Sequence, residues 1–143
     1  MKDYNLKRFV IMQDFYYKIA LSEIVAGFKE SHWMWYIFPQ LKGLGKSVQS
    51  DYYSISGLDE ARAYLEHPVL SKNLFEITEA LLEHSGKTAY SILGDDSVKL
   101  RSSMTLFALV SENNSVFHKV LDVFFEGKMD EQTLEILERI YNN

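Results

Sequence analysis

Residues 31–47 read S-H-W-M-W-Y-I-F-P-Q-L-K-G-L-G-K-S, and no other stretch of the chain resembles them. The first half contains both tryptophans of the protein, and the second half contains two of its seven glycines, each with a lysine beside it. Aromatic rings offer flat apolar surfaces, and a cationic glycine loop can present backbone amides to an anion. The segment therefore favours a nucleotide-like ligand over a simple core helix.

Around this segment, length and composition predict one globular domain covering residues 1–143. Hydrophobic residues make up 47% of the chain and charged residues 24%, with two prolines. These values are ordinary for a folded protein and exclude a disordered or fibrous chain. One hydrophobic core is expected at this length.

Charge and cysteine content narrow the partners and the compartment. The net charge is −5, from 15 basic and 20 acidic residues without a long run of either sign, which argues against a nucleic-acid or membrane surface. The absence of cysteine rules out disulfides and thiolate metal sites and fits a reducing compartment. No apolar run reaches about 18 residues and no signal-like start is seen, so we expect a cytoplasmic protein.

Apolar residues recur at helical spacing through most of the chain. The spacing predicts helices at residues 6–13, 17–27, 60–65, 70–86, 88–93, 117–127 and 130–141, and a short helix or aromatic loop at 33–38. Residues 98–110 are apolar on nearly all sides, which predicts a central buried helix. A few β-branched and aromatic runs, such as residues 52–55, could be extended, but none alternates over the length that a half-buried strand needs. The sequence thus predicts a compact all-α fold.

Helix boundaries are predicted from capping and breaking residues. Ser47 is expected to cap a short helix through residue 53, and Ser56 with Asp59 resembles a capping box. Pro68 is expected to stop a helix. Asp95 or Asp96 is expected to cap the central helix, and Asp130 the last one.

Familiar catalytic motifs are absent from the sequence. Gly45-Lys46-Ser47 imitates the end of a P-loop, but Gln40 stands where that motif requires a glycine. The four histidines show no metal-ligand spacing, and no G-x-S-x-G element is present. We therefore expect no metal, no cofactor and no serine nucleophile.

A weaker candidate is an anion site in the glycine loop. The amides near Gly43 and Gly45, the charge of Lys46, and a helix starting at Ser47 can together bind a phosphate. Gln40 is expected to orient the ligand. The alternative is a tight connection with solvated lysines.

Ring stacking and proton transfer are assigned to neighbouring residues, each with a structural alternative. Trp33 and Trp35 can stack on a ligand or belong to the core. His32, which follows Glu30 and Ser31, can donate a proton or serve as a cap.

Arg101 is the cation of the apolar central helix and lies beside Ser102. It is expected either to clamp an anion or to pair with Glu23, Asp51 or Asp59, because an unpaired buried charge is strongly unfavourable.

The chain resembles the domain of unknown function 1810 family over nearly its whole length. The residues that carry the resemblance are L-x-R-F-V at 6–10 with Gln13, the segment 31–47, Y-Y-S-I-S-G-L-D-E-A-R-A-Y-L-E-H-P-V-L at 52–70 and K-L-R-S-S-M-T-L-F at 99–107. The resemblance implies a helical fold without an established activity. Members have been labelled calpastatin, but calpastatin-like inhibitors are extended and proline-rich, so we reject that label.

This family is in turn similar in fold to the NADAR group of helical N-glycosidases, which implies a ribosyl-phosphate, ADP-ribose or NAD-related ligand. The Glu-His pair of that group is not matched, because Lys7 and Arg8 stand before residues 9–13. A catalytic carboxylate cannot be transferred, and only proximity suggests Glu23, Glu30 or Asp51.

Two functions remain open at this point. One is an N-glycosidase-like enzyme with His32 and Glu30 as catalytic candidates, and the other is a non-catalytic nucleotide-binding or protein-interaction module. In both cases we expect a small phosphorylated or nucleotide-like ligand. We expect His32, Trp33, Gln40, Lys46 and Arg101 to line one cavity, and a carboxylate with a raised pKa there would indicate chemistry. The oligomeric state stays open.

Overall fold

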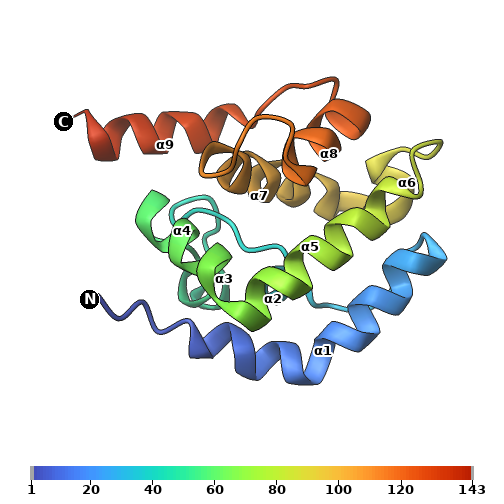
Figure 1. The fold of residues 1–143 in the computed structure, drawn as a ribbon, viewed down its shortest axis with the longest axis horizontal. Coiled ribbons are helices and arrows are strands. Elements are labelled where there is room, and N and C mark those ends of the chain that lie inside the picture. The colour runs from blue at the N-terminus through green and yellow to red at the C-terminus, as the bar shows by residue number, and fades with distance from the viewer. Residues whose placement is uncertain (1, 143) are drawn as a thin grey trace.

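The computed structural model describes residues 2–142 and confirms the all-α fold (Figure 1). The helices are α1 (Lys7–Ala26), α2 (Met34–Ile37), α3 (Val48–Tyr52), α4 (Leu58–Glu66), α5 (Pro68–Leu82), α6 (Ala89–Leu93), the 3₁₀ turn η1 (Gly94–Asp96), α7 (Ser97–Leu109), α8 (Val116–Phe125) and α9 (Glu131–Tyr141). Within residues 2–142, extended pairing is limited to an isolated parallel bridge between Leu41 and Ile55. That bridge is all that the predicted extended residues 52–55 provide.

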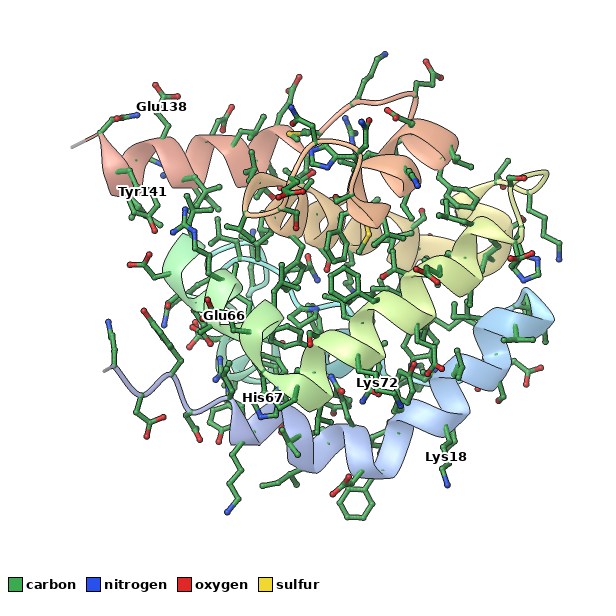
Figure 2. All side chains as sticks on the ribbon, viewed as in Figure 1. Lys18, Glu66, His67, Lys72, Glu138 and Tyr141 are labelled. Carbon is green, nitrogen blue, oxygen red and sulfur yellow. The ribbon has the colours of Figure 1, made fainter. Side chains whose placement is uncertain are left out.

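The helices are arranged around α5 and α7. Figure 1 shows α1 along the lower edge, α5 crossing the middle, and α7, α8 and α9 above, with both chain ends on the left. The packing agrees with this view, since α5 contacts α1, α4 and α8, while α7 contacts α4, α6, α8 and α9. Side chains fill the space between these helices (Figure 2).

Helix α7 is the central buried helix that its apolar sequence predicts. Residues 102–108 are all buried, which is uncommon for a helix that faces solvent on one side. Its hydroxyl groups are mostly satisfied within the fold, because Thr105 Oγ1 donates to the Arg101 carbonyl at 2.8 Å and accepts from the Asp130 amide at 2.8 Å. Residues 102–108 of α7 can therefore be packed on all sides.

Two of the predicted caps are confirmed. The Ser47 hydroxyl accepts from the Ser50 amide and starts α3, and Asp130 accepts from the Thr133 amide and starts α9. Such caps satisfy amides that have no partner within the helix.

Some other predicted boundaries are wrong. The first two predicted helices form one helix, α1, because residues 7–26 contain no glycine or proline, and it ends at Gly27 with φ of +87°. The predicted stop at Pro68 is confirmed, since α4 ends at Glu66. Pro68 is also the first residue of α5, because proline is tolerated at the first helical position and the His67 side chain caps the amides that follow. Asp96 precedes α7 without capping it through its side chain.

The predicted capping box at Ser56 is also absent. Gly57 is the N-cap of α4, and both the amide and the hydroxyl of Ser56 donate to Glu60 Oε1, at 2.9 and 2.8 Å.

Arg8 fastens α1 to the segment that leads into α4. Its guanidinium is buried and pairs with Glu60 Oε2 at 2.9 Å. Its nitrogens also donate to four backbone carbonyls, those of Tyr4, Asn5, Tyr52 and Ser54. Arg8 therefore links the start of α1, the segment that contains Tyr52 and Ser54, and Glu60 of α4 through hydrogen bonds to oxygen atoms.

Candidate functional site

The aromatic segment begins at a buried tryptophan that is fastened to α1. Trp33 is completely buried, and its indole Nε1 donates to Glu23 Oε1 at 2.8 Å. The same carboxylate accepts from the Glu30 amide, the Ser31 amide and the Ser31 hydroxyl, at 2.9, 3.0 and 2.6 Å. Glu23 therefore organises the turn between α1 and α2, and both of its oxygens are occupied.

The hydrogen bonds of Glu23 change its acidity. Burial raises the pKa of a carboxyl, but the donors at Ser31, Glu30 and Trp33 outweigh it and lower the pKa of Glu23 from 4.5 to about 2. Because the folded protein prefers the ionised form, Glu23 stabilises the fold above pH 4.5, and this contribution is lost as the pH falls towards 2.

We expect Glu23→Gln to weaken the acid dependence of stability. Gln is neutral at every pH, so the free energy of unfolding of the variant should fall less steeply than that of wild type between pH 4.5 and 2. Urea titrations across this range measure the slope. Glu30→Gln is the control, since the Glu30 side chain is exposed, and equal slopes for all three proteins contradict the assignment.

A pocket of about 320 Å³ lies beside this turn. Its walls carry cationic, acidic and aromatic side chains from the turn, α2, α3, η1 and α7: Lys29, His32, Trp33, Met34, Trp35, Gln49, Asp96 and Lys99. Its size is at the lower end of the range for small-molecule sites.

One wall of this pocket carries an aspartate that is paired with two lysines. Asp96 Oδ2 is 2.9 Å from Lys29 Nζ, and Asp96 Oδ1 is 2.8 Å from Lys99 Nζ. Each ammonium also lies over an indole, since Lys29 Nζ is 4.9 Å from the Trp33 ring centre and Lys99 Nζ is 4.5 Å from that of Trp35. Two cations are thereby concentrated at one wall of the pocket.

The electrostatics of this wall keep Asp96 ionised. Burial raises its pKa, but hydrogen bonds and charge from Lys99 and Lys29 lower it below the usual range. Counting the three charged residues, two lysines and one aspartate leave a net charge of +1. The pocket can attract an anion, and it contains no carboxylate with a raised pKa.

The glycine loop lies against Trp35, the more exposed of the two tryptophans. A Cβ on Gly45 would lie 3.6 Å from Trp35 Cη2 but only 2.4 Å from the Ser50 hydroxyl, so glycine is required there. Ser50 is in turn engaged by Ser47, whose amide donates to Ser50 Oγ at 3.0 Å. Gln49, which lines the pocket, donates to the Tyr36 hydroxyl.

The prediction of one shared cavity is wrong for two cations. Lys46 lines a different recess of about 190 Å³, formed by the glycine loop and α9, where Gly43 approaches Ile136. Arg101 donates to the carbonyls of Lys128 and Met129, at 2.9 and 2.8 Å. Arg101 thus holds the loop between α8 and α9. The sequence predicted a carboxylate or a ligand anion as its partner, and backbone carbonyls were not considered.

The other predicted site residues have mainly structural positions. The Gln40 side chain is buried, and the backbone carbonyl of Gln40 accepts from the Ile55 amide at 2.8 Å. Ser102 donates to the Val98 carbonyl, and Ser47 caps α3. Glu30 is exposed, and its amide donates to Glu23. Of the predicted residues, the pocket brings together His32, Trp33 and Trp35.

Sequence reasoning missed the residues that give the pocket its charge. The spacing of Asp96 and Lys99 by three residues was a usable signal, because side chains at i and i+3 meet at the start of a helix. Lys29 gave no such signal, since its partner lies 67 residues away (96 minus 29).

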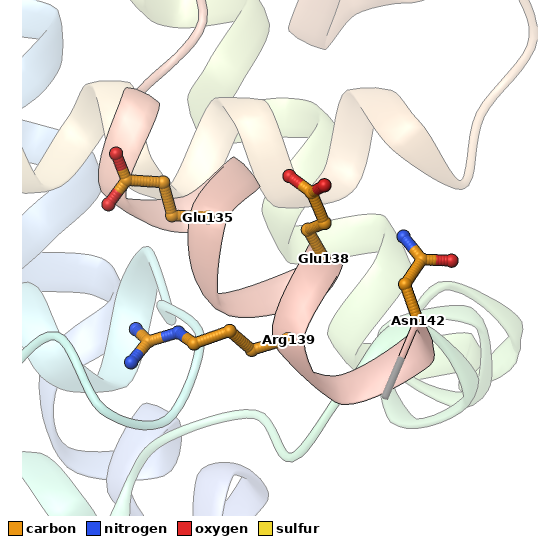
Figure 3. Close-up of a pocket in the computed structure, with 4 residues that line it drawn as sticks. All are labelled: Glu135, Glu138, Arg139 and Asn142. Atoms are coloured by element: carbon orange, nitrogen blue, oxygen red, sulfur yellow. The ribbon is translucent and has the colours of Figure 1, made fainter.

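A larger recess, of about 500 Å³, lies on α9 and is lined by Glu135, Glu138, Arg139 and Asn142 (Figure 3). All four side chains come from α9 and the residue that follows it. Its lining residues include no aromatic ring, and all of them are exposed. We therefore place the candidate site in the smaller pocket, which has both aromatic rings and buried charge.

Within residues 2–142, no three histidine, aspartate or glutamate side chains converge to hold a metal ion. No helix in the same range is sufficiently long and apolar to span a bilayer.

Comparisons with known proteins identify relatives without a described activity. A family described as "Protein of unknown function (DUF1810)" matches residues 3–137. The crystal structure of the conserved hypothetical protein Rv1873 from Mycobacterium tuberculosis is similar, with 42% identity, a TM-score of 0.91, and coverage of 94% of this chain and 96% of that chain. Curated proteins gave no match. The resemblance that the sequence motifs indicated is thereby confirmed, and the chain belongs to the DUF1810 family.

Proposed function

We propose that this protein binds a small phosphorylated, nucleotide-like ligand in the pocket lined by Trp33, Trp35 and Lys99, and that it does not transform the ligand. One observation carries the proposal: the ammonium groups of Lys29 and Lys99 meet at Asp96 beside two indole rings, in a pocket of about 320 Å³. Cationic donors bind phosphate oxygens through charge-assisted hydrogen bonds, and an indole face binds a base.

The two lysines have different freedom to reach a ligand. The Lys29 side chain is only 8% exposed and also donates to the Ser31 carbonyl at 2.6 Å, whereas the Lys99 side chain is 36% exposed. Lys99 is therefore the cation that can reach a phosphate. His32 lines the same pocket and is exposed.

The carboxylates argue for binding over catalysis. An N-glycosidase needs a carboxylate that can face a developing oxocarbenium ion and an acid that protonates the leaving group. Glu23 has both oxygens hydrogen-bonded, and Asp96 is held by two lysines. Asp51 is exposed and lies 3.5 Å from Lys42, outside the residues that line the pocket.

The N-glycosidase alternative, with His32 and Glu30 as candidates, stays a prediction, as does the likeness to NADAR proteins. It is tested by incubating the protein with NAD and ADP-ribose and measuring released base by chromatography. Turnover that disappears in Glu30→Gln or His32→Ala, with ligand affinity retained, would replace the binding proposal by an enzymatic one.

Lys99→Ala should weaken binding of a phosphorylated ligand by about 1.5–3 kcal/mol, roughly tenfold to a hundredfold. The reason is the loss of a charge-assisted hydrogen bond from the more accessible lysine. A thermal-shift screen with AMP, ADP-ribose and NAD selects the probe, and calorimetric titration then gives its Kd for wild type and variant.

Two lysine variants serve as controls for this measurement. Lys46→Ala removes a cation from the neighbouring glycine loop, and Lys72→Ala removes an exposed one from α5 (Figure 2). Neither residue lines the pocket, so both should bind like wild type. An equal loss in all three variants would show that net charge alone drives binding, and no binding of any probe to wild type would end the proposal.

We propose the cytoplasm as the location of the protein, because phosphorylated metabolites of this kind occur there and a chain without cysteine fits a reducing compartment.

A further inference from the structure

We propose that Lys99 is the specificity-determining residue of this pocket, and that it selects ligands that carry an aromatic ring and a phosphate together. The inference rests on the proposed function, because it assigns the ligand class of the same site. In the structure Lys99 covers the ring on which a base would stack, so the ring and the phosphate must be recognised as one unit.

The pocket offers one indole for stacking. Trp33 is completely buried and its Nε1 is bound to Glu23, so its faces are not open to a ligand. Trp35 is partly exposed. The predicted stacking role is therefore restricted to Trp35, while Trp33 belongs to the core.

Lys99 occupies the face of Trp35. Its ammonium lies 4.5 Å from the ring centre and 2.8 Å from Asp96 Oδ1. A base that stacks on this face must first move the ammonium away from both partners. A ring without a charge offers the ammonium nothing in exchange, and binding of a nucleoside is therefore opposed.

A phosphate reverses this balance. When the ligand carries an anion, the ammonium that leaves Trp35 gains a charge-assisted hydrogen bond to a phosphate oxygen. Asp96 is not left unpaired by this movement, because Lys29 remains 2.9 Å from its other oxygen. Lys29 itself is held by the Ser31 carbonyl at 2.6 Å and stays in place.

This arrangement makes opposite predictions for two ligands in one variant. Removing the Lys99 side chain uncovers Trp35, so adenosine should bind Lys99→Ala at least several-fold more tightly than wild type. The same variant should bind AMP at least tenfold more weakly, because the phosphate loses its partner. The preference for AMP over adenosine should therefore collapse.

The experiment measures the Kd of AMP, ADP-ribose, adenosine and inorganic phosphate for wild type, Lys99→Ala and Lys46→Ala by calorimetry. Wild type should prefer AMP or ADP-ribose over adenosine by at least tenfold, and Lys46→Ala should keep that preference. Inorganic phosphate should bind weakly to wild type, because it gains no stacking. Lys99→Gln, which keeps much of the length of the side chain without its charge, repeats the test if Lys99→Ala does not fold.

The outcomes separate this inference from the proposed function. If neither AMP nor ADP-ribose binds wild type, both fail. If either binds wild type but adenosine binds equally well, or if the Lys99 variants lose AMP without gaining adenosine, the pocket remains a phosphate site and the selective role of Lys99 is overturned.

Discussion

Arg8→Met is expected to lower the free energy of unfolding by about 3–5 kcal/mol, the usual effect of removing one partner of a buried ion pair. The variant leaves the Glu60 carboxylate buried at the position where it met the guanidinium at 2.9 Å. It also removes the donors to four backbone carbonyls, among them Tyr52 and Ser54. The melting temperature should fall by on the order of 10 °C, and urea titration gives the free energy.

Arg62→Met is the matched control for this substitution. Arg62 pairs with Asp59 at 3.0 Å, but both side chains are more than half exposed, and an exposed pair of this kind contributes about 0–1 kcal/mol. Similar losses in the two variants would mean that Arg8 acts as a surface charge and not as the fastening of α1 to α4.

Trp33→Ala is expected to destabilise the protein by about 3–5 kcal/mol, because it leaves a large cavity in the core. It also removes one of the donors that hold Glu23. Trp35→Ala, with a partly exposed ring, should lower stability by about 1 kcal/mol and abolish most ligand binding. Melting curves beside Kd values for the same probe measure the contrast.

Two results for the tryptophan variants would contradict different roles for Trp33 and Trp35. If both variants lose stability equally and bind equally, the two rings have the same role, and the separation into a core ring and a stacking ring is wrong. Trp33→Phe keeps most of the ring volume and should recover most of the loss, which separates the cavity from the missing hydrogen bond.

Those parts of the fold that depend on local signals were predictable from the sequence. The caps at Ser47 and Asp130 form within one turn of the residues that they serve, and the apolar run at 98–110 predicts the burial that residues 102–108 show. Pro68 ends one helix as predicted, but the start of α5 at the same residue was not predicted, because the side-chain cap is His67, an unusual capping residue.

The charged parts of the site were not predictable in the same way. Arg101 was expected to meet a carboxylate or a ligand, but the nearby carbonyls of the loop before α9 satisfy it. Lys46 was assigned by its sequence neighbours, whereas the fold turns it towards α9. In both cases the partner is fixed by tertiary packing, to which sequence spacing gives no access.

The sharing of Asp96 by two lysines also sets an order of events on the ribosome. Trp33, Glu23 and Lys29 leave the ribosome early and can form their turn at once, while Asp96 follows 67 residues later (96 minus 29). At the usual rates of synthesis this interval is roughly 3–13 s. During this interval the nascent chain contains Trp33, Trp35 and Lys29 but not Asp96, the residue with which Lys29 pairs. The pocket is therefore completed only after η1 and α7 have been made, and a chain that stops before them has the aromatic segment but not the complete pocket.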